Sequence, residues 1–199
     1  MALANYADLS AAIINYVDDP TLTNVADFVT LAESEFNRML RVPDMEQRSS
    51  ATLTGSALAL PTDFMEMRSV HIDNIALAQV TPADYAKLTV TIAGIPAIYT
   101  IQNRQIFFKP LASSATIIEM VYYQTIPSLV TASTNWLMTR APDMYLMASL
   151  AQAEFFGWND DRLPVIQARV AQLYQQMMID GERRAYGAAP LAPRIGYRP

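Results

Sequence analysis

The stretch from Thr134 to Asp180 most constrains the fold of this chain, because it predicts two long helices in direct succession. The first, over 135–156, is apolar nearly all round, as is typical of a helix buried among other helices. In the second, over 160–182, apolar residues recur at alternating steps of three and four: Leu163, Ile166, Val170, Leu173 and Met177. This short seam favours antiparallel packing on the preceding helix. We therefore expect the pair to supply most of the apolar surface of the core.

A second pair of helices is predicted at the N-terminus, over 5–17 and 24–41. Both segments carry apolar residues at helical spacing. Asn5 is a good N-cap for the first helix, and Asp8 places negative charge at its positive end. Proline follows each segment, at Pro20 and at Pro43, and ends the helical pattern there.

Residues 45–125 have a different character, with short strand-like pieces separated by turn residues. The best strand is Ala115 to Gln124, which is rich in β-branched and aromatic residues, and Asn103-Arg104 suits a tight hairpin turn. We therefore predict a mixed α+β fold, mainly α: a bundle of two N-terminal and two C-terminal helices with a small antiparallel β insertion. The expected domain covers 1–186, and 187–199 form an extended C-terminal arm.

Composition places the chain among folded proteins with partners. Of 199 residues, 52% are apolar and only 17% are charged, below the usual share of about a quarter. The chain also has 11 Met and 10 Tyr, residue types that suit contact surfaces. It has no Cys, which excludes disulfides and thiolate metal sites. No apolar run reaches the roughly 20 residues that a membrane helix needs, so we expect no membrane contact.

The sequence offers no catalytic site, metal site or cofactor motif. His71 is the sole histidine, and no glycine-rich phosphate loop is present. Acidic pairs at 18–19 and 160–161 fall at helix ends, where capping explains them better than catalysis does. Glu33 and Glu35 lie about 200° apart on one helix and cannot converge. We therefore predict no enzyme, no metal and no cofactor.

The C-terminal arm is the candidate partner-binding site. The chain has a net charge of −5, yet from Gly181 onward Glu182 is the single acid among four arginines. An acidic body argues against nucleic acid as its main ligand. Arginine and tyrosine are favoured interface anchors, and prolines stiffen an arm. The candidate residues are Arg183, Arg184, Tyr186, Arg194, Tyr197 and Arg198. The alternative interpretation is a solvated chain end.

Several segments, in order, resemble the motifs of one protein family. Leu60–Arg68 is similar to its "LPxDFxExR" segment, and Gly94–Ile101, followed by Gln105–Pro110, to its "GxPxxYTI" strand. Glu119–Pro127 resembles its closing strand, and Thr134–Leu146 resembles its "TNWLLxRxPDLYLY" helix start. The match runs from about Phe36 to Arg184, and the family that the chain thus resembles is the head-to-tail adaptors of tailed phages.

This resemblance implies a structural virion protein at the head-tail junction, assembled in the host cytoplasm. Family members form a homo-oligomeric ring, commonly dodecameric, that binds the portal protein, receives tail proteins and leaves an axial channel through which DNA passes without specific binding. Their fold is a helical bundle with a small β-rich part, and their C-terminal tails reach a neighbouring subunit or the portal.

Two other functions stay open at this point. A tail-completion or tail-tube component would bind tail proteins rather than the portal. A carboxylate-dependent hydrolase would lose its activity on the substitution Glu35→Gln.

Overall fold

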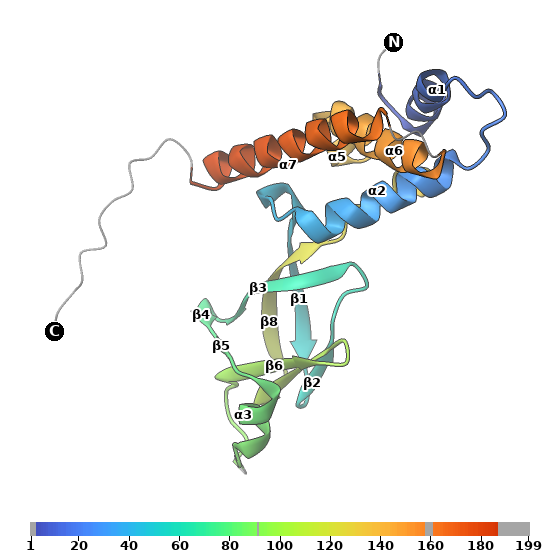
Figure 1. The fold of residues 1–199 in the computed structure, drawn as a ribbon. Coiled ribbons are helices and arrows are strands. Elements are labelled where there is room, and N and C mark those ends of the chain that lie inside the picture. The colour runs from blue at the N-terminus through green and yellow to red at the C-terminus, as the bar shows by residue number, and fades with distance from the viewer. Residues whose placement is uncertain (1–2, 91, 158–160, 187–199) are drawn as a thin grey trace. The chain divides into compact units, whose positions relative to one another are not determined.

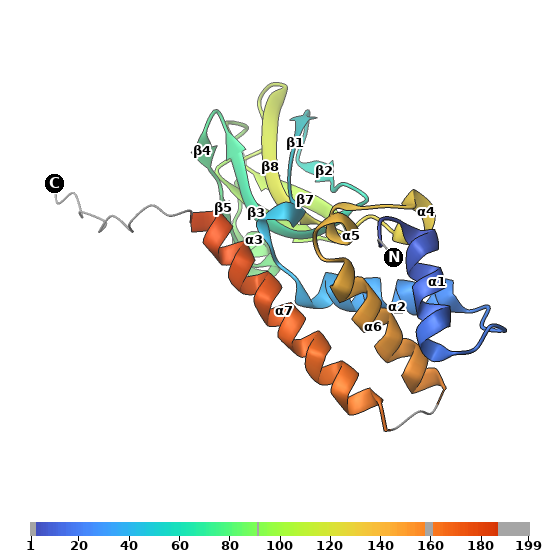
Figure 2. The same ribbon diagram turned by 90° about the horizontal axis from the view of Figure 1, so that it is seen from above.

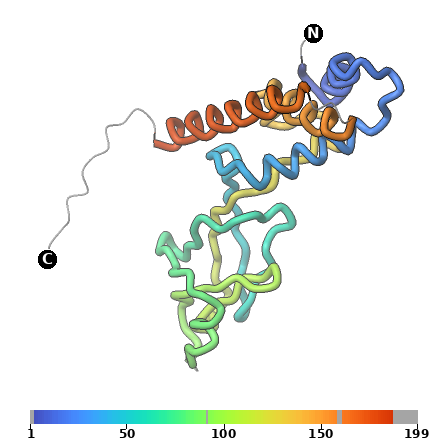
Figure 3. The backbone as a smooth tube through the Cα atoms, in the orientation of Figure 1, coloured from blue at the N-terminus to red at the C-terminus, as the bar shows by residue number. Residues whose placement is uncertain are grey.

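The computed structural model describes residues 3–90, 92–157 and 161–186 and divides the chain into two compact units (Figure 1). The helical unit is built from Met1–Asp44 together with Ile126–Pro199, and the β unit is Met45–Thr125. The chain leaves the helical unit after α2 and re-enters it before α4. Figure 3 traces this path along the backbone. Each unit has its own core.

Within the described residues the helical unit contains six α-helices: α1 (Tyr6–Val17), α2 (Val25–Met39), α4 (Leu129–Ala132), α5 (Trp136–Arg140), α6 (Pro142–Phe156) and α7 (Leu163–Tyr186). Helix α6 is central, because it packs against α1, α2, α5 and α7 (Figure 2). Its buried side chains include Met144, Tyr145 and Leu150. The expectation that a helix apolar nearly all round is buried among others is confirmed.

The helix expected over 135–156 is instead two helices, so this prediction was wrong. Ala141 separates α5 from α6 with φ −136° and ψ 66°, outside the helical region. The cause is Pro142, whose ring disfavours helical geometry at the preceding residue. Pro142 then starts α6, where a proline loses no hydrogen bond.

Other helix ends follow local chemistry. The Asn5 side chain accepts a hydrogen bond from the Asp8 N–H at 3.0 Å, which confirms it as the cap of α1. Helix α2 ends at Met39, two residues before the expected end. Helix α7 continues to Tyr186, past the expected end at 182, and therefore includes Arg183 and Arg184.

Among its described residues, the β unit contains two four-stranded sheets. One has the order β1 (Glu46–Leu53), β8 (Thr116–Gln124), β3 (Phe64–Ile72) and β4 (Ile75–Ala76). The other has the order β2 (Ala57–Ala59), β7 (Gln105–Lys109), β6 (Ile98–Gln102) and β5 (Ala78–Gln79). The pairs are antiparallel except β5 with β6, and the short helix α3 (Pro82–Lys87) follows β5. The 3₁₀ turn η1 (Pro43–Met45) leads into β1.

Strand β8 organises this unit because it pairs with both β1 and β3. Its alternate residues Ile118, Met120 and Tyr122 are buried, as a period-two pattern requires. The hairpin between β6 and β7 turns at Asn103 and Arg104, both at positive φ, as predicted. The mixed α and β class is thus confirmed. Two sheets with a core of their own replace the small antiparallel insertion in a helical bundle that we expected.

Candidate functional site

The predicted partner-binding residues are only partly covered by the described chain. Arg183, Arg184 and Tyr186 lie in the last turn of α7, whereas Arg194, Tyr197 and Arg198 lie outside the described residues. Arg183 is exposed and approaches the Asp180 carboxylate at 3.9 Å, one turn back on the same helix. Tyr186 is 70% exposed. These two side chains are open to a partner.

Arg184 has a different environment from its neighbour. Its guanidinium forms two hydrogen bonds with the Asp44 carboxylate, one of them from Nη1 to Oδ1 at 3.0 Å. The same carboxylate accepts a hydrogen bond from Arg140 Nη1 at 2.6 Å. Asp44 thereby joins α7 to α5 at the last residue of the chain before the β unit. Arg184 fixes the end of α7 rather than extending from it.

Gly181 explains how α7 comes so close to that segment. It is buried, and a β-carbon at this position would lie 2.9 Å from Val42 Cγ1 and 3.4 Å from Pro43 Cδ. Glycine within a helix costs about 1 kcal/mol relative to alanine, so a close approach is the physical reason for it here. Nothing in the sequence around Gly181 indicates this contact.

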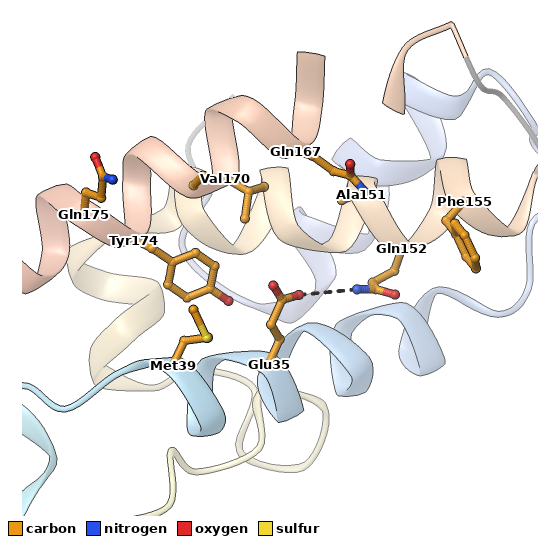
Figure 4. Close-up of a pocket in the computed structure, with 10 residues that line it drawn as sticks. Glu35, Met39, Ala151, Gln152, Phe155, Gln167, Val170, Tyr174 and Gln175 are labelled. Atoms are coloured by element: carbon orange, nitrogen blue, oxygen red, sulfur yellow. Dashed lines mark hydrogen bonds between the residues drawn. The ribbon is translucent and has the colours of Figure 1, made fainter. Parts of the chain in front are cut away.

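A groove lies between α2, α6 and α7 (Figure 4). We call it the α7 groove; it has a volume of about 570 Å³ and is lined by Glu35, Met39, Ala151, Gln152, Phe155, Gln167, Val170, Ala171, Tyr174 and Gln175. Apolar surface dominates it, and Met39 and Phe155 are largely exposed. The sequence signal for it was the apolar seam of α7, of which Val170 is a member.

Two of the residues that line this groove carry polar groups that bear on its chemistry, Glu35 and Tyr174. Glu35 accepts a hydrogen bond from the Gln152 amide at 3.4 Å. Tyr174 is only 8% exposed, and its hydroxyl has no hydrogen-bond partner among the described residues. Burial, with a smaller contribution from the Glu35 charge, raises the pKa of Tyr174 above its ordinary value, so the hydroxyl keeps its proton. The hydroxyl oxygen itself is fully buried in the wall of the groove, out of reach of an occupant, and a buried donor without an acceptor is costly.

Glu33 has a structural role, as a buried hydrogen-bond acceptor, that was not predicted from the sequence. It is buried, and its carboxylate accepts hydrogen bonds from the Leu129 N–H at 2.6 Å and the Tyr145 hydroxyl at 3.2 Å. Asn135 donates to that same hydroxyl at 2.6 Å. Burial raises the pKa of Glu33 above its ordinary value, although hydrogen bonds to the carboxylate oppose the shift. This network joins α2, α4, α5 and α6.

His71 lies on β3, opposite Ala76 of β4 and Glu119 of β8. Among the described residues, no group of three or more His, Asp or Glu side chains is placed to hold a metal ion. In the same part of the chain, no helix is both long enough and apolar enough to cross a membrane.

Comparison with known proteins gives a family. No curated protein matches the chain. The family model described as "SU10 adaptor protein" matches residues 4–194, a range that takes in the two units and the arm residue Arg194. This range contains the motifs that resemble the head-to-tail adaptors of tailed phages. The chain belongs to the SU10 adaptor protein family.

Proposed function

We propose that this protein is a head-to-tail adaptor that forms a ring between the portal and the tail of a phage particle, with an axial channel for DNA. The observation that carries the proposal is the family match over residues 4–194, because this family consists of structural phage adaptors. The proposed place of the protein is the virion, at the head-tail junction, and its proposed role is structural.

The surface of the helical unit supports the proposal. A ring needs two different contact surfaces on each protomer, since every copy touches a neighbour on either side. Several large apolar side chains are exposed in this unit: Tyr16, Leu31, Met39, Phe155, Phe156, Val165, Ile179 and Tyr186. Met39 lines one groove with Phe155 and another with Ile179, and exposed apolar groups that lie together are typical of interaction surfaces.

The net negative charge of the protein supports the proposed axial channel for DNA. An acidic protein repels a polyanion, so DNA would pass along a channel wall of this chain without binding to it. Basic residues along the channel in a cryo-EM map of the particle would contradict this part of the proposal.

The proposed contact with the portal is the C-terminal arm. Arg183 and Tyr186 are exposed at the end of α7, and Arg194, Tyr197 and Arg198 follow in the sequence. Arg184 is the exception, since it is bound to Asp44, and we assign it to positioning the helix end.

The experiment is to mix purified protein with its portal and to determine the mass of the complex by native mass spectrometry. We expect a ring, dodecameric if it follows the symmetry implied by the family resemblance, bound to the portal. A protein that stays monomeric with its portal present would contradict the ring. Binding to tail proteins without binding to the portal would favour a tail-completion or tail-tube component instead.

A further inference from the structure

The α7 groove combines exposed apolar walls with one negative charge. Its volume of about 570 Å³ lies in the range of pockets that hold small molecules, so it can take an aromatic side chain. Met39 and Phe155 on its walls are largely exposed. Among the described residues that line it, Glu35 is the one with a charge, and in Figure 4 its half-buried side chain extends from α2 toward α7. Arg38, which follows on α2, is exposed but does not line the groove.

A second hollow lies on the other side of α7. It has a volume of about 410 Å³, lies between α1, α6 and α7, and has Asn15, Tyr16, Arg162 and Ile166 in its lining. Ile166 and Gln175, which lines the groove, are nine residues apart and therefore lie about 180° apart on the helix. We call Asn15, Tyr16 and Arg162 the α1 flank.

The α1 flank presents an aromatic side chain and a cation close together. Tyr16 is 56% exposed, and the Arg162 side chain is 59% exposed. Arg162 Nη1 donates a hydrogen bond to the Tyr16 carbonyl oxygen at 3.4 Å and approaches the buried Glu154 carboxylate at 3.5 Å. The other donors of this guanidinium have no partner among the described residues, so they remain open to an acceptor on a neighbour.

The groove and the α1 flank are complementary in chemistry. Glu35 and Met39 are one turn apart on α2, so on the groove an acceptor lies beside an apolar wall. The Glu35 carboxylate has acceptor capacity left, since the hydrogen bond that it receives from Gln152 is 3.4 Å long. Tyrosine and arginine are residue types that often carry the binding energy of an interface, and arginine pairs well with a carboxylate. Tyr16 and Arg162 therefore suit the groove as occupants.

We propose that the α7 groove of one protomer binds the α1 flank of the next copy, with the Tyr16 ring between Met39 and Phe155 and with Arg162 paired to Glu35. Because the two surfaces differ and lie on opposite sides of α7, a copy that uses one of them keeps the other for a further neighbour, as a ring requires. This inference rests on the proposed ring and adds the surfaces through which its copies meet.

Disulfide trapping in the full-length chain tests the contact, since the native sequence has no cysteine. One variant carries Asn15→Cys with Gln175→Cys, which leaves the four side chains of the proposed contact unchanged. Its matched control carries Asn15→Cys with Gln176→Cys. Both glutamines are exposed, but Gln176 lies about 100° further round α7 and does not line the groove. Each variant is mixed with the portal and oxidised, and denaturing electrophoresis without reductant measures the covalent products.

The Gln175 variant should give a ladder of covalent multimers, because each copy is joined to a different neighbour on either side. The Gln176 variant should give several-fold less of these products. Equal yields from the two variants, or products that stop at dimers, would overturn the contact if the native protein forms a ring on the portal. A native protein that stays monomeric with its portal would overturn the proposed ring itself, so the two failures are distinguishable.

A double-mutant cycle tests the ion pair. Glu35→Gln and Arg162→Gln, which preserve side-chain length or shape in part, should each raise several-fold the protein concentration needed for ring assembly on the portal. The double variant should lose much less than the product of the two single effects, because the first substitution already breaks the pair. Thermal melting by circular dichroism checks that each variant is folded. Effects that simply multiply would overturn the pairing of Arg162 with Glu35.

Discussion

Gly181 of α7 and Val42, which follows α2, are in such close contact that a β-carbon on residue 181 would lie 2.9 Å from Val42 Cγ1. Val42 is fully buried and belongs to the last segment of the helical unit before the chain enters the β unit. The missing side chain therefore lets the end of α7 lie directly on this segment. Two neighbouring contacts, from Arg184 and Arg140 to Asp44, strengthen the same junction.

The first prediction concerns this close approach. Glycine to alanine at an open position in a helix stabilises a protein by up to about 1 kcal/mol. At position 181 the substitution Gly181→Ala should instead lower stability, by about 1–3 kcal/mol, because the added methyl group overpacks against Val42. Urea unfolding followed by circular dichroism measures the change.

Val42→Ala provides the control for that experiment, since it removes the methyl groups that the new side chain meets. The double variant should lose less stability than the two single losses added together. A stabilised Gly181→Ala protein would contradict the close packing.

The second prediction separates two adjacent arginines. Arg184→Ala should reduce the free energy of unfolding by about 1–3 kcal/mol, because it removes charged hydrogen bonds to the partly buried Asp44. Arg183→Ala is the matched control, and its exposed 3.9 Å contact with Asp180 should be worth less than about 0.5 kcal/mol. Equal losses in the two variants, measured by urea unfolding, would show that the Asp44 contact does not stabilise the fold.

Features that depend on neighbouring residues, such as helix caps and tight turns, could be predicted from the sequence. Asn5 caps α1, and Asn103 with Arg104 turns the β6–β7 hairpin, because capping and tight turns depend on a few adjacent residues. The strand expected at Ala115 to Gln124 is β8 apart from its first residue. Pro142 also indicates the break at Ala141, because proline disfavours helical geometry at the preceding residue. The apolar pattern that continues on both sides of the break favoured a single helix instead.

Contacts between residues that are far apart in the sequence could not be predicted. The partners of Glu33, at Leu129 and Tyr145, lie about a hundred residues further along the chain, and an acid on a helix ordinarily faces solvent. Arg184 was expected in a partner-binding arm because nothing near it in the sequence points to Asp44. The α7 groove depends on three helices packing together, of which periodicity indicates only the apolar faces.

The third prediction uses the buried carboxylate. Burial raises the folded-state pKa of Glu33 above its ordinary value of 4.5, so the folded state binds this proton more tightly than the unfolded state. Its contribution to stability is therefore complete below the unfolded pKa and is lost as pH rises through the folded pKa. Glu33→Gln retains an acceptor for Leu129 and has no charge to desolvate. The free energy of unfolding of the native protein, minus that of Glu33→Gln, should fall as pH increases from 4 upward. A difference that is flat or rises with pH would contradict a raised pKa.

The last prediction tests the division between fold and arm. Deleting residues 187–199 should preserve folding, because the described cores of both units are built from residues before 187. The truncated protein should keep its far-ultraviolet circular dichroism and a single melting transition close to that of the full chain. Its binding to the portal, followed by native mass spectrometry, should weaken strongly, because the deletion removes Arg194, Tyr197 and Arg198. Substituting only these three residues by alanine in the full-length chain is the matched control and should weaken portal binding to a similar extent. A truncated protein that unfolds would show that the arm is part of the core, and one that binds the portal normally would place the contact elsewhere on the protomer.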